Sequence, residues 1–204
     1  MAKKTKGEID ASTEEKIKEA ARKVFTKKGF AATRTRDIAE EANINLALLN
    51  YYFRSKEKLF DIVMMENIQQ FLMAMKGVLN DKNSSILEKV TTFSENYITL
   101  LKEHADLPLF ILSEIRANPE KLAANMGAKD ILLNSNLYMQ IQEATKHTIN
   151  PIHFIINMLG LAVFPFIAGP LFQAIGGLKQ NDYGKLMEER KKMIPIWIEA
   201  MLKV

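Results

Sequence analysis

The chain has 204 residues, of which 48% are apolar and 25% charged, with a formal net charge of +4. This length and composition are typical of a globular protein that buries its own core, and the lack of cysteine excludes disulfides, thiolate metal sites and cysteine catalysis. Residues 1–60 hold 14 basic and 9 acidic residues, whereas the rest of the chain holds 14 and 15. We therefore expect a surface for an anionic partner near the N-terminus.

Residues 1–11 are polar and are expected to be flexible. They lack the apolar core of a secretory signal, so we expect a cytoplasmic protein. A first helix is predicted from Ser12, which forms a capping-box pattern with Glu15. Its apolar residues recur at helical spacing, at Ile17, Ala20, Ala21, Val24 and Phe25. Gly29 is predicted to end this helix.

Residues 33–58, TRTRDIAEEANINLALLNYYFRSKEK, predict two short helices joined by a tight turn. Asn45 is a good N-cap for the second helix, and Leu48, Leu49 and Phe53 take inward positions in it. The outward positions are Leu46, Ala47, Asn50 and Tyr51. The basic side chains beside them are Arg34, Arg36, Arg54 and Lys56. Such a helix has the chemistry of a base reader flanked by phosphate contacts, as in a helix-turn-helix that enters the DNA major groove.

The rest of the chain also has helical periodicity. Ser55 is predicted to cap a helix that runs to about Gly77. Further helices are expected near residues 86–101, 107–115 and 131–148, with a looser segment near 118–127. Asp182 is predicted to cap the last helix. Because no strand alternation is found, the sequence predicts an all-α fold.

Residues 147–178 contain no Asp, Glu, Lys or Arg. Their length and apolarity raise a membrane-spanning alternative, but Pro165 and Pro170 would break a single helix in lipid unless neighbouring groups repaired its backbone. The other alternative is two helices buried against a partner subunit, because an uncharged surface in a soluble chain most often marks an oligomer interface. The residues expected at such a homodimer interface are Leu161, Leu186, Met193 and Trp197. No membrane partner is then expected.

Residues of about 13–60 resemble the DNA-binding domain of the tetracycline-repressor (TetR) family of transcriptional regulators. The matching pieces are AARKVFTKKGFAAT, RDIAEEANI and LLNYYFRSKEKLF. The resemblance implies an N-terminal three-helix helix-turn-helix domain over residues 1–58. A helical ligand-binding and dimerisation domain would follow over residues 59–204. The remainder resembles the family's regulatory domain in its length, its helical pattern and its two apolar C-terminal helices.

The resemblance also implies which residues meet a double-stranded DNA operator. They are Thr35, Arg36, Asn45, Leu46, Ala47, Asn50, Tyr51, Tyr52 and Lys56. Leu46 and Ala47 stand where the family often has a polar or basic residue and then glycine, and Asn50 stands where tyrosine is common. The operator sequence is therefore not transferable from a relative. The expected function is a dimeric repressor released from a near-palindromic operator by an unknown apolar small molecule, with an activator of the same fold as the alternative.

No catalytic motif, cofactor motif or metal-ligand pattern is found, so neither an enzyme nor a cofactor is expected. A pocket for the effector is expected inside the C-terminal helices, because large, soft side chains on several segments should converge there. The residues expected to line it are Phe93, Tyr97, His104, Phe110, Met126, Asn134, Tyr138, Met139, His147, Phe154 and Asn157.

Overall fold

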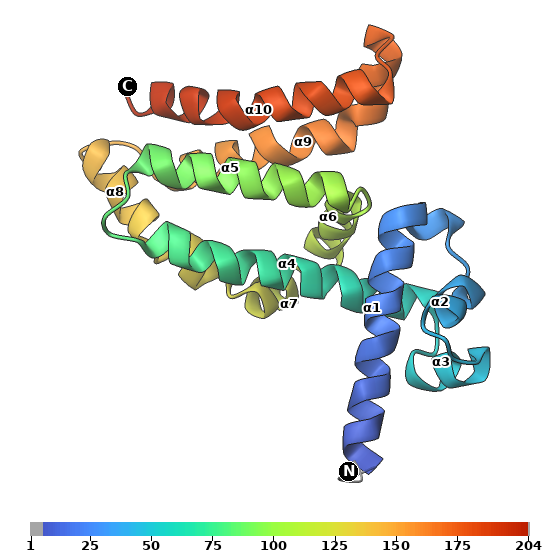
Figure 1. Cartoon of the computed structure of the whole chain (residues 1–204). Helices are drawn as coiled ribbons and strands as arrows, with labels where there is room; N and C mark the ends of the chain where they lie inside the picture. Colours follow the sequence, from blue (N-terminus) through green and yellow to red (C-terminus); the bar gives the residue numbers. More distant parts are fainter. Residues whose placement is uncertain (1–5, 204) are drawn as a thin grey trace. The chain divides into compact units, whose positions relative to one another are not determined.

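The computed structural model describes residues 6–203, with side chains from residue 11 onward. Within this part of the chain the protein consists of helices and connecting turns with no strand, which confirms the predicted all-α fold (Figure 1). The chain divides into two compact units. Unit 1 comprises residues 1–67 and 104–106, and unit 2 comprises residues 68–103 and 107–204. The predicted domain boundary after residue 58 stays a prediction.

Unit 1 contains α1 (Lys6–Ala32), α2 (Thr35–Glu41), α3 (Leu46–Tyr52) and the start of α4 (Lys56–Asn80). The prediction that Ser12 caps the first helix is wrong, because α1 already begins at Lys6. Serine and glutamate are also tolerated inside a helix, so the pattern alone did not fix the boundary. The expected flexibility of residues 1–11 stays a prediction. Residues 1–5 lie outside the described residues, and residues 6–11 form the first part of α1.

Gly29 interrupts α1, as predicted, with φ 73° and ψ 165°. This backbone conformation is open to glycine and strained for other residues. The turn that follows is held by two hydrogen bonds. The Phe30 N–H donates to the Asp106 carboxylate at 2.7 Å, and the Thr33 hydroxyl donates to the Gly29 carbonyl at 2.7 Å. The break therefore sets the direction in which the chain enters α2.

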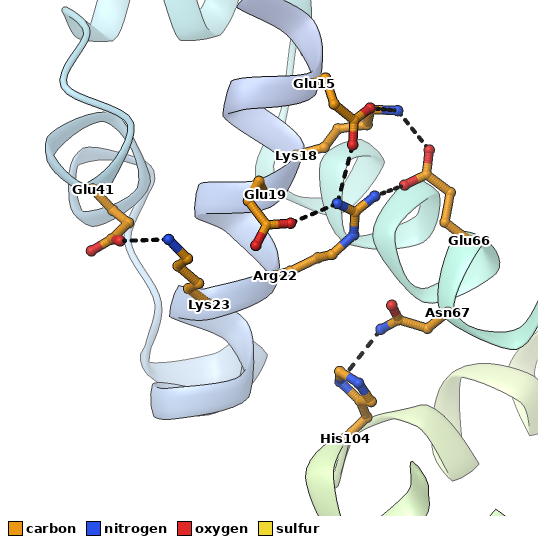
Figure 2. Close-up of polar contacts among 9 residues, drawn as sticks. All are labelled: Glu15, Lys18, Glu19, Arg22, Lys23, Glu41, Glu66, Asn67 and His104. Carbon is orange, nitrogen blue, oxygen red and sulfur yellow. Dashed lines mark hydrogen bonds and ion pairs between the residues drawn. The ribbon is translucent and has the colours of Figure 1, made fainter. Parts of the chain in front are cut away.

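An ion-pair network joins α1 to the start of α4 within unit 1 (Figure 2). Lys18 donates to one Glu66 oxygen at 2.7 Å, and Arg22 donates to the other. Glu15 lies between these two cations, and its hydrogen bond with Lys18 lowers the pKa of the Glu15 carboxyl. Because Glu66 is only 25% exposed, the network is shielded from solvent on one side and helps to fix α4 against α1.

Unit 2 contains the rest of α4 together with seven further helical segments. They are α5 (Ile86–Glu103), α6 (Leu107–Ala117), α7 (Pro119–Met126), the π-helical turn η1 (Lys129–Leu133), α8 (Asn136–Ala144), α9 (Ile152–Gly176) and α10 (Gln180–Met201). α5 packs against α8, α9 and α10 and buries Val90, Phe93, Tyr97 and Leu101. It is therefore the central helix of this unit.

Three predicted boundaries in unit 2 are wrong. The segment near 118–127 is not loose but forms α7, which has Pro119 in its first turn and a left-handed Gly127 at its C-cap. The single helix over 131–148 is replaced by η1 and α8, because the Ser135 hydroxyl caps α8 by accepting from the Tyr138 N–H at 3.2 Å. Asp182 lies in the first turn of α10 and does not cap it.

Pro165 and Pro170 both lie inside α9, so the expectation of two helices is wrong. Proline has no N–H, and position 165 therefore leaves the Leu161 carbonyl without its helical donor. Arg190 of α10 supplies two donors instead, Nε at 3.2 Å and Nη2 at 2.8 Å. The Tyr183 hydroxyl also donates to the Pro165 carbonyl at 2.6 Å. Side chains of α10 thus supply the hydrogen bond that the α9 backbone lacks at Pro165.

Among the described residues, α9 alone is long and apolar enough to cross a membrane by length and composition. Within the chain, 33% of its most apolar stretch is buried. Large apolar side chains that remain exposed on α9 and α10 include Ile156, Phe164, Leu171, Ile175 and Ile196. The fold therefore leaves a long apolar surface on its last two helices.

Candidate DNA-binding surface and ligand cavity

The orientation of α3 is set at its first turn and by its buried side. The Asn45 side-chain oxygen accepts a hydrogen bond from the Leu48 N–H at 2.8 Å, which confirms the predicted N-cap. Leu49 and Phe53 are buried and Leu48 is half-buried, and α3 packs against α2, in which Ile38 and Ala39 are buried. One face of α3 is therefore committed to the core, and the opposite face is fixed towards solvent.

That solvent face carries the side chains predicted to read bases. Leu46 is 42% exposed and Tyr51 is 77% exposed, and Ala47 and Asn50 are exposed too. Tyr52 is half-buried, with its ring edge-on to that of Tyr51 at 5.3 Å between centroids. An amide, a phenol and apolar groups on one short helix match the edges of adenine and the methyl group of thymine.

The residues at the start of α2 include polar and basic side chains that reach solvent. Thr35 is half-buried and Arg36 is exposed. The Arg34 N–H donates to the Asp37 carboxylate at 2.9 Å, and this bond, followed by the contact with Lys28, lowers the pKa of Asp37. Arg34 and Arg54 are exposed as well. These three exposed arginines are among the cations of this unit that are available for phosphate contact.

Lys56 has a structural role that the sequence did not reveal. Its ammonium donates to the carbonyls of Phe30 and Thr33, each at 3.0 Å, and lies 4.1 Å from the centre of the Phe30 ring. An ammonium has three donors, so one remains for another partner. The predicted phosphate contact stays a prediction, and Lys56 also holds the turn between α1 and α2.

A cavity of about 460 Å³ lies within unit 2. Its wall is built by α4, α5, α6, α7, η1 and α9, and it is open on one side. Leu112 and Ile115 of α6 and Phe164 of α9 belong to the wall and are also exposed to solvent. The described residues of the wall carry no charged side chain. The cavity is thus suited to an apolar molecule.

Phe93, Tyr97 and Met126 line this cavity, as expected. The other residues expected in a pocket do not. Phe110 and Phe154 are buried in the core, and Tyr138 is half-buried outside the wall. His104 belongs to unit 1, where its ring faces Asn67 (Figure 2). Those that face solvent are Asn134, Met139, His147 and Asn157.

Several cavity residues were missed by the sequence interpretation, among them Phe71 and Met75 of α4 and Ile111 of α6. Helical periodicity identifies residues on an apolar face, but it does not distinguish a side chain that fills the core from one that borders a void. No sequence pattern marks the difference.

The residues expected at a dimer interface lie on α9 and α10. Leu186 and Met193 are 40% and 38% exposed. Leu161 and Trp197 are half-buried, and the Arg190 guanidinium lies 5.1 Å from the centre of the Trp197 ring. All four thus lie on the last two helices, and none of them is fully buried.

Known proteins share both the helix-turn-helix segment and the whole fold. Residues 17–63 match the family model of bacterial regulatory proteins of the tetR family. The chain is 24% identical over 203 residues to the "Probable HTH-type transcriptional regulator YttP" of Bacillus subtilis, with 96% of each protein covered.

Two solved structures show the same fold. A tetR-family transcriptional regulator from Mesorhizobium loti is 18% identical, with a TM-score of 0.63 and 97% and 98% of the two chains covered. The transcriptional regulator FadR of Bacillus subtilis, solved with stearoyl-CoA, is 16% identical, with a TM-score of 0.58 and 88% and 96% covered.

The family match falls on α1 to α4, where the capped α3 presents its polar face, and the similarity to YttP extends over nearly the whole chain. These likenesses agree with the resemblance found in the sequence. The family's members are regulators and not enzymes. Residues 17–63 therefore match the tetR-family segment, and nearly the whole chain is similar to an HTH-type transcriptional regulator and has the fold of tetR-family regulators.

Proposed function

We propose that this regulator is a repressor that leaves its operator when a mainly apolar small molecule binds in unit 2. The observation that carries the proposal is the apolar cavity of about 460 Å³, which lies in the unit that does not contain α3. A site for a small molecule and a separate reader of DNA are the two sites that an allosteric regulator needs.

The DNA-binding site is proposed to comprise the start of α2 and the solvent face of α3. Asn50 and Tyr51 would contact base edges, and Leu46 would meet a thymine methyl group. Thr35, Arg36 and Lys56 would contact phosphates and fix the register of the helix on the duplex. The remaining members of the site are Asn45, Ala47 and Tyr52.

We propose that the protein acts as a homodimer formed through α9 and α10. The apolar surface of these helices is of the kind that a stable subunit interface buries. A two-fold dimer presents two copies of α3, so its operator is expected to be near-palindromic.

Ligand and operator are proposed to weaken each other's binding. α4 is one continuous helix that begins with Lys56 in unit 1 and carries Phe71 and Met75 of the cavity wall further along. A ligand that favours one arrangement of the cavity helices would change the position of the two α3 helices in the dimer. By linkage, DNA would then disfavour the ligand to the same extent.

FadR, with the same fold, was solved with stearoyl-CoA, whose acyl chain is apolar. This supports an apolar ligand for the present cavity. A cytoplasmic location is proposed for the same regulator. If the protein remained with the membrane fraction and required detergent for release, the cytoplasmic location would be wrong and α9 would be assigned as a membrane-spanning helix.

The proposed function is tested by selecting bound duplexes from random DNA and then titrating the selected operator with the protein. Apolar compounds that raise the melting temperature are added to the complex. An inducer should both stabilise the protein and weaken operator binding. Stabilising compounds that leave DNA affinity unchanged would contradict the allosteric mechanism, and activation of a reporter by the bound protein would contradict repression.

A further inference from the structure

The cavity in unit 2 contains one polar side chain. Among the described residues that form its wall, Tyr97 alone carries a side-chain oxygen or nitrogen. Tyr97 lies in the middle of α5 and is 4% exposed. Its ring stacks on Phe71 at 4.9 Å and lies 5.2 Å from the Phe93 ring, and both of these residues also line the cavity. The position of the tyrosine is therefore set by its aromatic neighbours.

Among the described residues the Tyr97 hydroxyl makes no hydrogen bond, and its oxygen is not one of the fully buried unpaired atoms, so it borders the space of the cavity. A buried hydroxyl without a partner is unfavourable, because it loses the hydrogen bonds that water would give it. Burial raises the pKa of Tyr97 to about 12, so the group stays protonated near neutral pH and keeps its donor. A phenylalanine would pack in the same place without this penalty, so packing alone does not account for the hydroxyl.

Water is a poor partner for this hydroxyl. An ordered buried water needs two to four polar groups, and the cavity wall offers one such side chain. A charged ligand group is a poor partner too, because the described wall contains no side chain of opposite charge to pair with it. A neutral group with a lone pair, carried by an otherwise apolar molecule, satisfies the hydroxyl without burying a charge.

From this geometry we infer that Tyr97 is the hydrogen-bonding anchor of the effector, and that the effector is an uncharged, mainly apolar molecule with one carbonyl or similar acceptor placed to meet the Tyr97 hydroxyl. The inference rests on the proposed function in taking the cavity as the effector site. It adds the chemical class of the ligand and the residue that orients it.

The test uses three probes of equal chain length, namely methyl decanoate, decane and the decanoate anion. Their affinities are measured with the full-length protein by displacement of the neutral dye Nile red at neutral pH. Wild-type protein should bind the ester more tightly than decane by about three- to ten-fold, the range expected for one neutral hydrogen bond. The decanoate anion should bind more weakly than the ester.

The variant Tyr97→Phe removes one oxygen and keeps the ring. It should lose the preference for the ester over decane, and its melting temperature without ligand should equal or exceed that of the wild type, because an unpaired hydroxyl is gone. Tyr138→Phe makes the same chemical change outside the cavity wall and should leave both affinities unchanged.

The inference is overturned if Tyr97→Phe binds ester and decane as the wild type does, if it weakens both equally, if decanoate binds as tightly as the ester, or if no probe binds. Operator titration separates this from the proposed function. Probes that bind through Tyr97 but leave operator affinity unchanged support the anchor and contradict the release mechanism. Probes that release DNA equally well from the wild type and from Tyr97→Phe support the release mechanism and contradict the anchor.

Discussion

Single residues of unit 1 fall into two groups, those proposed to contact DNA and those that hold α3 and its neighbouring turn in place. Asn50 and Tyr51 have exposed side chains on α3, whereas Lys56 is held by two backbone carbonyls and an aromatic ring. Asn45 belongs to both groups, because its side-chain oxygen caps α3 while the residue is exposed and is part of the proposed DNA-binding site. Substitutions at these positions should therefore affect DNA affinity and stability in different proportions.

Asn50→Ala and Tyr51→Ala are each expected to weaken operator binding by about 1–3 kcal/mol, the range for a good base contact. Both side chains are exposed, so the melting temperature should stay close to that of the wild type. Titration of the selected operator and of random DNA at the same salt concentration measures the effect. If both variants lost the same affinity for the two DNAs, base reading by α3 would be wrong.

Lys56→Met should lower the free energy of unfolding by about 1–3 kcal/mol, because hydrogen bonds from a charged donor to the Phe30 and Thr33 carbonyls are lost. Lys58→Met, at an exposed position of the same helix, is the matched control and should unfold like the wild type. Denaturant titration gives both values. An unchanged stability of Lys56→Met, together with weaker binding to every DNA, would instead assign Lys56 to phosphate contact alone.

Among the helices, α9 and α10 depend on each other through backbone groups as well as side chains. Pro165 lacks the N–H that would pair with the Leu161 carbonyl, and Arg190 of α10 donates two hydrogen bonds to that carbonyl instead. Burial lowers the pKa of Arg190, but arginine remains charged at neutral pH. The bond is therefore charge-assisted, and it links the stability of α9 to α10.

Arg190→Met is expected to destabilise the protein by about 1–3 kcal/mol, since it leaves the Leu161 carbonyl unpaired. In the background of Pro165→Ala, which restores the backbone N–H at position 165, the same change should cost less. Denaturant unfolding of the two single variants and the double variant completes the cycle. Additive effects within about 0.5 kcal/mol would show that Arg190 does not compensate for the proline.

Local patterns predicted the elements better than their boundaries. Asn45, Gly29 and Ser55 act where the sequence placed them, because caps and turns are short-range interactions. The predicted helix break at Pro165 is wrong. The donor that replaces the missing N–H belongs to Arg190, 25 positions further along the chain, so local sequence could not reveal it. The face of α3 followed from periodicity, but the cavity wall did not, since a void depends on how several helices fail to fill the space between them.

At the scale of the whole molecule, α9 and α10 leave large apolar side chains exposed to solvent. Ile156, Phe164 and Ile196 are each more than half exposed. Large exposed apolar patches are rare on monomeric proteins and are typical of subunit interfaces. The proposed dimer would cover this surface.

Leu186→Asp and Met193→Asp should convert the dimer to monomers, because each places an unpaired charge in the proposed interface, at an expected loss of several kcal/mol of association energy. Both side chains are exposed in the single chain, so the monomer should still fold. Met73→Asp, at a 77% exposed position of α4, is the control. Sedimentation at micromolar concentration gives the state of each variant, and a wild type that sediments as a monomer would contradict the interface.

The apolar wall of the cavity also bears on how such a regulator diversifies. Exchanges among leucine, isoleucine and methionine of similar volume usually cost less than about 1.5 kcal/mol, so the wall tolerates successive substitutions while the fold is retained. Leu112 and Ile115, at the exposed rim, are the positions where such changes disturb the core least. After gene duplication, one copy can therefore acquire a new inducer while its operator reader in unit 1 stays unchanged. A library at these two positions would imitate that route and yield sensors for related molecules.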